Sequence, residues 1–380
     1  MDEETECFIG FNVFPGIGPI RFKLLLDYFG SAREAWRAPL VTLRKIKLGE
    51  KLSGEFDHFR KSFDLDAYIS NLNKLHVSVL TLKDPRYPIL LSRIPDAPFV
   101  LYVKGKPSYT KATEGGERHK IPLDLTRTVA VVGTRKITPY GEEVTRRLVE
   151  GLASYGCTIV SGLAYGVDAV AHRSAIDAGG KTIAVLGCGI DIIAPPSNAR
   201  LYYDIADGAG AIVSEVPLGM RPTKGLFPAR NRIISGLSLG VLVTEGADDS
   251  GALITARYAG EQGRDVFAVP GPITSPYSRG PAKLLKNGAK LVESVEDILE
   301  ELNIPANLAK DAEDLDKKIQ ELTSAEEKKI AVLLSDRRMY IDEIVRVSGL
   351  TARQVGSTIT LLEMKRIIKD YGEKVYGIWI

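Results

Sequence analysis

The feature that most constrains the fold is a regular alternation of short apolar segments and helix-length segments between residues 127 and 301. The apolar segments are rich in Val and Ile and are apolar along nearly their whole length, as is typical of strands buried on both faces. They occupy residues 128–133, 158–162, 182–187, 211–215, 240–245 and 265–270. The helix-length segments between them include residues 140–155, 167–178, 229–237 and 252–262. This alternation predicts an α/β, Rossmann-like, doubly wound and mostly parallel sheet.

In such sheets ligands bind beyond the carboxyl ends of the strands, so the residues that follow each strand are the candidates for function. The first strand is followed by Gly133, Thr134, Arg135 and Lys136. A glycine allows close approach to a phosphate, amides at a helix start favour an anion, and arginine offers a forked donor. A tight turn with a surface arginine is the alternative. The dinucleotide fingerprint G-x-G-x-x-G is absent here, so we expect neither NAD nor another cofactor.

After the second strand, Ser161, Gly162 and Gly166 lie in a loop that leads into a helix. We expect this loop to expose backbone amides at the start of that helix. We expect Asp168 to cap that helix or to hold the loop, rather than to act in catalysis. His172, a lone histidine on the same helix, is expected to have a packing or hydrogen-bonding role.

Two further loops follow later strands. Ser250 and Gly251, after the fifth strand, predict one more anion pocket by the same reasoning. Cys188 follows the third strand, but no partner histidine is identifiable in the sequence, so a nucleophilic role is not expected.

The most informative segment is 221–244, which contains Arg221, Lys224, Arg230 and Arg232 and no acidic residue. Phe227 lies inside this basic run, next to a proline that we expect to keep it out of a helix. Basic side chains along a phosphate backbone, with an aromatic ring on which a base can stack, are the elements of a single-stranded nucleic-acid site. The alternative places Phe227 in the core and the arginines on an ordinary surface.

Several ordered motifs closely resemble the DNA-processing protein A (DprA/Smf) family over residues 128–301. They include VAVVGTRKITPYG, VSGLAYGVDAVAHRSAIDAGG and FPARNRIISGLSLGVLVTEGADDSGALITARYAGEQGRDVFAVPG. The resemblance implies single-stranded-DNA binding without catalysis, a homodimer formed through the Rossmann-like domain, and loading of the recombinase RecA during natural transformation and recombination. The single-stranded-DNA-binding protein is a further implied partner. The family's DNA pocket maps onto Gly133, Thr134, Arg135, Lys224, Phe227, Arg230, Asn231 and Arg232.

The flanking regions predict two smaller domains. Residues 1–110 are expected to form a helical domain, of helix-hairpin-helix or SAM-like type, whose hairpin contains Gly16 and Gly18. Such a hairpin offers amides to a DNA phosphate, although a purely structural hairpin explains it equally well. A polar insertion at 107–125 precedes the central domain, which we place at 111–302.

An acidic linker is expected at 303–322, followed by a winged helix at 323–380. Thr351 is predicted to cap the recognition helix, which has Arg353 and Gln354 early but few other basic residues. Groove reading and a regulatory or protein-contact role are therefore equally open for this domain.

Composition excludes several classes of protein. The net charge of +2 indicates that any basic site must arise from local clustering. Cys7, Cys157 and Cys188 show no metal-ligand spacing, which argues against a disulfide framework or a zinc site and favours a reducing cytoplasm. The acidic start of the chain does not resemble a secretory signal, and no apolar run approaches the ~20 residues of a membrane span.

Two other functions compete with DNA binding. The chain could be a phosphoribohydrolase-like enzyme that handles a nucleotide with Arg232 and either Glu245 or Asp168, on fold-level analogy. It could also be a transcription regulator that uses the winged helix, which predicts a preference for double-stranded DNA.

Overall fold

The computed structural model describes residues 1–46, 48–105 and 125–305, and most of the chain from 324 to 378. Beyond 305 the described residues are 319, 322, 324–336, 339–365, 367–370, 372 and 374–378. Nearly all of the expected polar insertion and most of the expected acidic linker therefore lie outside the described residues. The chain forms two compact units, residues 1–304 and 305–380, and each is considered by itself.

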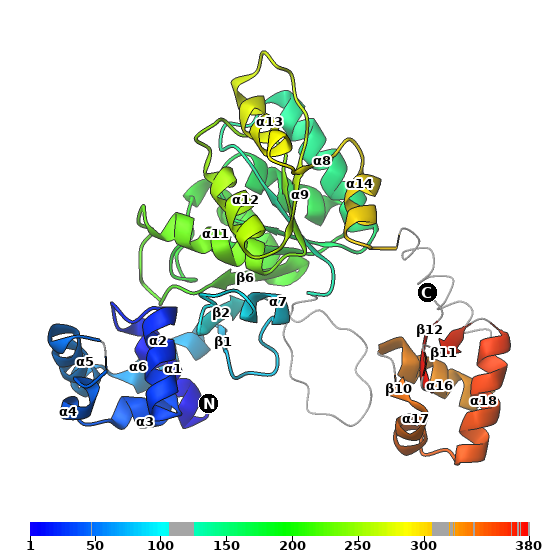
Figure 1. Cartoon of the computed structure of the whole chain (residues 1–380), viewed down its shortest axis with the longest axis horizontal. Helices are drawn as coiled ribbons and strands as arrows, with labels where there is room; N and C mark the ends of the chain where they lie inside the picture. Colours follow the sequence, from blue (N-terminus) through cyan, green and yellow to red (C-terminus); the bar gives the residue numbers. More distant parts are fainter. Residues whose placement is uncertain are drawn as a thin grey trace. The chain divides into compact units, whose positions relative to one another are not determined.

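The first unit, coloured from blue to yellow in Figure 1, is built on a nine-stranded sheet. Its strand order is β1-β2-β6-β5-β4-β3-β7-β8-β9. All six strands expected from the sequence are present, and neighbours from β6 to β9 pair in parallel. They are β3 (Thr128–Val132), β4 (Thr158–Ser161), β5 (Thr182–Leu186), β6 (Gly210–Ser214), β7 (Gly240–Val243) and β8 (Asp265–Ala268). The prediction of a Rossmann-like, mostly parallel α/β sheet is confirmed.

Helices cover both faces of this sheet because successive strand residues point to opposite sides. On one face, Val129 and Val131 pack with α8 (Pro139–Ser154), α9 (Val167–Asp177) and α14 (Val295–Glu301). On the other face, Ala130 and Val132 pack with α7 (Ile89–Ser92), α11 (Leu226–Gly236) and α12 (Gly251–Glu261). The chain runs outward from β3 to β6 and then returns to β7 on the other side of β3. The topological switch point therefore lies between β3 and β7, where such folds bind ligands.

Three strands of this sheet were not expected from the sequence. β1 (Ser78–Thr81) and β2 (Val100–Lys104) add to the sheet in antiparallel fashion, with Tyr102 opposite Ser214. The sequence reading placed them in the N-terminal helical domain, whereas they extend the central sheet beyond β6. β9 (Lys290–Leu291) forms the opposite edge, after α13 (Arg279–Lys286).

Residues before the sheet form the expected helices. They are α1 (Glu3–Val13), α2 (Pro19–Phe29), α3 (Ala32–Arg37), α4 (Leu40–Leu43), α5 (Glu50–Ser62) and α6 (Leu65–Lys74). At the centre of this group of helices, the Phe11 and Phe56 rings stack with their centroids 4.8 Å apart. Between α1 and α2, Gly16 adopts a φ of 103°, which favours glycine. A phosphate-binding role for this hairpin stays a prediction.

Buried polar contacts join these helices to the sheet. The Tyr102 hydroxyl donates to Asn12 Oδ1 at 2.8 Å, and Asn12 Nδ2 donates to the Glu215 carbonyl at 3.1 Å. The Tyr68 hydroxyl accepts from the Leu218 amide at 2.8 Å. The segment after β6, which leads into the basic run, is thus hydrogen-bonded to the helical domain.

The second unit has the order of a winged helix, as predicted. Its helices are α16 (Ala325–Asp336), α17 (Ile341–Ser348) and α18 (Ala352–Met364), and its sheet has the order β10-β12-β11. The strands are β10 (Met339–Tyr340), β11 (Ile368–Asp370) and β12 (Val375–Ile378). Thr351 caps α18, as expected, and the Gln354 side chain completes the capping box. No helix in the described parts of either unit is long and apolar enough to cross a bilayer.

Candidate nucleic-acid interface

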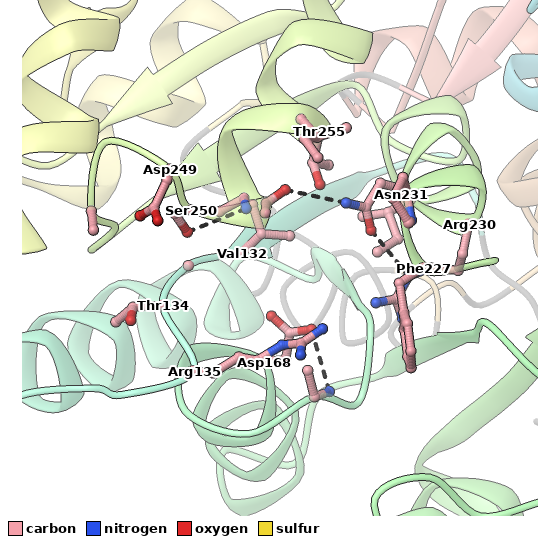
Figure 2. Close-up of a pocket in the computed structure, with 18 of the residues that line it drawn as sticks. Val132, Thr134, Arg135, Asp168, Phe227, Arg230, Asn231, Asp249, Ser250 and Thr255 are labelled. Carbon is pink, nitrogen blue, oxygen red and sulfur yellow. Dashed lines mark hydrogen bonds between the residues drawn. The ribbon is translucent and has the colours of Figure 1, made fainter. Parts of the chain in front are cut away.

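A pocket of about 610 Å³ lies at the switch point, where the loops after β3, β4 and β7 meet the start of α11 (Figure 2). Ten of the residues predicted for the site line it. These are Gly133, Thr134, Arg135, Lys136, Lys224, Phe227, Arg230, Asn231, Ser250 and Gly251. The other four, Ser161, Gly162, Gly166 and Arg232, do not.

The loop after β3 is fixed by Glu245, the second residue after β7. The Thr134 amide donates to the Glu245 carbonyl at 2.7 Å. The buried Glu245 carboxylate accepts from the amide and the hydroxyl of Thr138, at 3.0 and 2.7 Å, where α8 begins. Gly133 has no room for a side chain, because a Cβ there would lie 2.5 Å from Val167 Cγ2. The loop is therefore held tightly while Arg135 next to it stays exposed.

The loop after β4 borders the pocket and is held in place by Asp168. Asp168 Oδ2 accepts from the amides of Gly162 and Ala164 at 3.1 and 3.4 Å. Asp168 thus holds the loop, one of its two expected roles, and the cap position of α9 is Gly166 instead. Burial raises the pKa of the Asp168 carboxyl, and the positive charge of Arg230 opposes that rise.

Three residues of this loop were predicted to contact DNA, but they do not line the pocket. The Ser161 hydroxyl is buried and donates to the Val131 carbonyl at 2.7 Å. At Gly162, a Cβ would lie 2.2 Å from an Arg230 guanidinium nitrogen, and at Gly166 it would lie 2.2 Å from the Thr134 carbonyl. Their small size lets the loops pack together, but none of the three lines the pocket.

Phe227 lies at the start of α11 and is half-buried. The expectation that Pro228 keeps it out of a helix is wrong: proline is tolerated in a first turn, whose amides have no partner inside the helix. The Arg135 guanidinium lies 5.4 Å from the centroid of the Phe227 ring, a cation–π distance. Figure 2 shows Arg135 reaching from the loop after β3 toward Phe227. Lys224 is exposed one residue before the helix cap.

Arg230 and Asn231 form the inner wall. Arg230 is buried and donates to the Gly162 and Val185 carbonyls and, through Nε, to Asn231 Oδ1 at 3.1 Å. Asn231 Nδ2 donates to the Gly251 carbonyl at 3.2 Å. Burial lowers the pKa of the Arg230 guanidinium. The hydrogen bonds of Arg230 hold its guanidinium in place at the pocket wall and tie α11 to β5.

Arg232 requires the largest correction, because it does not face the pocket. Its guanidinium is buried and pairs with Glu215 and, at 3.1 Å, with Asp96 Oδ2. Neither Glu245 nor Asp168, the partners considered for an enzyme, pairs with it. Arg232 instead links α11 to the segments around β2 and β6, on the far side of the helix from the pocket.

The loop after β7 completes the pocket. The Ser250 hydroxyl caps α12 by accepting from the Ala252 amide at 3.3 Å. Asp249 and Tyr277 also line the pocket and were missed from the sequence. Asp249 could have been found from its place in the loop that contains Ser250. Tyr277 follows β8, outside the segments used for the prediction, and its carbonyl accepts from the Gly246 amide at 2.7 Å.

Two reactive residue types near the pocket are structural. His172 is buried, Nε2 accepts from the Leu163 amide at 3.3 Å, and Nδ1 donates to Thr182 Oγ1 at 2.6 Å. Burial, together with the charge of Arg230, lowers the His172 pKa to about 3. Burial also raises the pKa of the Cys188 thiol to about 11, so it is not a thiolate near neutral pH.

The pocket therefore joins exposed cations, a buried cation and an aromatic face. Arg135, Lys136 and Lys224 can contact phosphates, and Phe227 offers a ring for a base. Within the described ranges, no cluster of His, Cys, Asp or Glu has the arrangement of a metal site.

Comparison with known proteins gives a consistent family. Residues 78–303 match the family described as DNA recombination-mediator protein A, and residues 313–370 match the one described as DprA winged helix domain. Protein Smf of Synechocystis is 39% identical over 302 residues, which cover 79% of this chain and 73% of that protein. DNA processing protein DprA of Bacillus subtilis is 43% identical over 262 residues, which cover 69% of this chain and 82% of that protein.

Two solved structures are similar. The X-ray structure of DNA processing protein A from Streptococcus pneumoniae superposes with a TM-score of 0.66 and 36% identity, over 79% of this chain and 99% of that one. The Helicobacter pylori protein, described as having a unique single-stranded DNA binding mode, gives a TM-score of 0.50 and 31% identity, over 60% of this chain and 96% of that one.

The buried His172 predicts a pH dependence of stability. Its pKa in the folded chain is about 3, below the ordinary value of 6.5, so unfolding is accompanied by proton uptake between these values. This contribution to stability is present above pH 6.5 and is lost as the pH falls toward 3. We expect His172→Gln to reduce the fall in melting temperature between about pH 7 and about pH 4, measured by calorimetry. His58→Gln, at an exposed histidine of α5, is the control. An unchanged fall in His172→Gln would contradict the assignment.

Proposed function

Because the chain belongs to the DNA recombination-mediator protein A family, we propose that it binds single-stranded DNA in the switch-point pocket and loads the recombinase RecA onto it. The observation that carries the proposal is the Arg135–Phe227 pair, which places a guanidinium 5.4 Å from an aromatic ring at the mouth of a positively charged pocket. A ring beside cations suits an unpaired base and its phosphates, whereas the bases of a duplex are already stacked.

The proposed contacts divide by chemistry. Arg135, Lys136 and Lys224 are exposed and would pair with phosphates. Gly133 and Thr134 would contribute close backbone approach, and Ser250 and Gly251 would form the opposite rim. Phe227 would stack one base. Arg230 and Asn231 would act from the inner wall, by charge and by fixing α11. We do not propose contacts for Ser161, Gly162, Gly166 or Arg232.

We propose binding without catalysis. Of the two carboxylates that line the pocket, Asp168 already accepts hydrogen bonds from backbone amides, and Asp249 is exposed in the loop after β7. The Glu245 carboxylate behind the loop after β3 also accepts from a backbone amide. His172 is committed on both ring nitrogens. A general acid or base must reach a reacting group, and the Asp168, Glu245 and His172 side chains are directed into the protein.

The role in the cell follows from the family. We propose that the chain acts in natural transformation and recombination, displacing the single-stranded-DNA-binding protein as RecA assembles. RecA and its DNA lie in the cytoplasm, so the proposed function requires the chain to act there.

We also propose a homodimer through the Rossmann-like domain. An apolar groove of about 460 Å³ runs between α12 and α13 at the β9 edge, lined in part by Leu253, Val266 and Leu284. Leu291 on β9 is 49% exposed beside it. A second copy related by a two-fold axis would place each Leu291 against an apolar surface, as a self-complementary interface requires.

Single-stranded DNA binding is tested by anisotropy with a labelled oligothymidylate and unlabelled single- or double-stranded competitors. We expect the single strand to compete better. Phe227→Ala should weaken binding about 5- to 100-fold, because one stacked base is lost, and Phe227→Trp should restore it. Lys224→Ala should weaken binding and make the slope of log K against log salt less negative by about 0.7, as expected for one lost phosphate contact. Lys74→Ala, at an exposed lysine of α6, is the control. Binding as tight as wild type in both pocket variants would refute the site.

RecA loading is tested with DNA already coated by single-stranded-DNA-binding protein. The wild-type chain should shorten the lag before RecA begins to hydrolyse ATP on that DNA. A Lys224→Ala, Phe227→Ala double variant should not, because it cannot hold the strand. The proposal fails if the wild-type chain binds DNA yet leaves the lag unchanged.

The dimer is tested by light scattering coupled to gel filtration. We expect wild type at the mass of two chains and Leu291→Arg at the mass of one, because a charge would be buried without a partner. Ile20→Arg, on the exposed face of α2, is the control and should stay dimeric. A wild-type mass of one chain would reject this part of the proposal.

A further inference from the structure

We propose that Tyr165 is a second stacking platform, so that the bound strand passes from Phe227 across Arg135 to Tyr165. This inference rests on the proposed function and extends it to a residue outside the pocket. The Tyr165 side chain is 50% exposed, and the inference assigns to it the nucleotide adjacent to the one that stacks on Phe227.

The position of Tyr165 follows from its two neighbours in the loop between β4 and α9. Ala164 lines the pocket. Gly166 packs against the backbone of the loop after β3, where a Cβ would lie 2.2 Å from the Thr134 carbonyl oxygen and 2.9 Å from Arg135 Cα. Tyr165 is thus next to a residue in contact with Arg135, whose guanidinium lies beside the Phe227 ring. The backbone at Tyr165 is therefore adjacent to that of Arg135, and the proposed route runs from Phe227 past Arg135 to Tyr165.

The loop that carries Tyr165 is held from several directions. The Asp168 carboxylate accepts from the Gly162 and Ala164 amides. Asn198 Nδ2 donates to the carbonyls of Leu163 and Ala164 at 3.0 and 3.2 Å. The Val167 amide donates to the Thr134 carbonyl at 3.1 Å. The backbone on both sides of Tyr165 is therefore fixed by partners from three other segments.

The Tyr165 side chain contrasts with this fixed backbone. Its neighbours Leu163 and Val167 are fully buried, whereas half of its own surface faces solvent. No hydrogen bond or ring contact is found for it in the described part of the chain. A rigid loop that presents an aromatic ring loses little conformational entropy when a base stacks on it. Packing of the core does not explain this arrangement, but a ligand with a flat apolar face does.

Basic residues in the segments next to the Tyr165 loop fit a phosphate backbone. Arg135 and Lys136 are exposed on the pocket side. Asn198, which donates to the loop, directly precedes α10 (Ala199–Asp204), where Arg200 is exposed. Of the acids in these segments, Asp168 is buried, whereas Asp191 and the pocket residue Asp249 are exposed. A strand on Tyr165 would therefore have cations in both neighbouring segments.

The experiment compares the full-length chain and its variants on oligothymidylates of increasing length, by anisotropy. Tyr165→Ala should weaken binding of a long oligonucleotide about fivefold or more, the effect of losing one stacked base. It should have little effect on an oligonucleotide too short to extend past the Phe227 pocket. The salt slope should not change, because no phosphate contact is removed. Tyr165→Phe should bind as wild type, since the ring is kept. Tyr28→Ala, at a tyrosine of α2 that is 54% exposed, is the matched control.

A second measurement does not depend on affinity. Tyr165→Trp places a fluorophore on the loop, and its emission, after subtraction of the wild-type signal, should be quenched by a long oligonucleotide through stacking. An unquenched signal from a variant that binds DNA would overturn the inference. So would wild-type affinity of Tyr165→Ala for long oligonucleotides, if Phe227→Ala binds weakly in the same assay. Absence of binding by the wild-type chain would instead reject the proposed function itself.

Discussion

The pocket depends on the way Glu245 joins the two loops that leave the sheet on either side of the switch point. Its carbonyl accepts from Thr134, and its carboxylate accepts from Thr138 at the start of α8. Residue 141 must be glycine to leave room for this carboxylate, because a Cβ on Gly141 would lie 2.0 Å from a carboxylate oxygen of Glu245. Pairing of β3 with β7 brings the two loop ends together, and Glu245 extends the connection beyond the strands. Arg135 comes directly after Thr134, whose amide is held by this contact, so the exposed Arg135 side chain extends from a fixed backbone.

The second constraint is the buried Arg230. A buried guanidinium is costly unless it is paired and hydrogen-bonded, and here two carbonyls, Asn231 and the charge of Asp168 compensate for lost water. Because each charge offsets part of the cost of burying the other, we expect loss of either Asp168 or Arg230 to destabilise the chain. The same charge contributes positive potential to the pocket from within the protein, where salt screens it less than surface charges. Structure and ligand affinity thus depend on one residue.

Much of this was predictable from the sequence, because apolar runs and the glycine-rich loops behind them are local signals. The six parallel strands and ten of the pocket residues follow from that pattern. Arg232 was misplaced although the predicted helix 229–237 already contained it, because the helical periodicity was not applied to the basic residues; α11 itself spans Leu226–Gly236. Residues two apart on a helix point about 200° apart, so Arg230 and Arg232 cannot share a face, whereas Phe227, Arg230 and Asn231 can. β1 and β2 could not be assigned to the sheet, because β2 pairs with β6, a contact distant in sequence, and β1 joins the sheet only through β2.

The small net charge of the chain sets how binding can work. With a net charge of +2, long-range attraction of DNA to the protein is weak, and affinity must come from groups close to the strand. A few cations at one sheet edge supply the part of the affinity that falls as salt is added, and aromatic rings supply a part that salt affects little. Because stacking accepts every base, such a site does not select sequence. Under the proposed function it would select unpaired strands, since only these have free base faces to offer to Phe227, and the same physical requirement would apply at Tyr165.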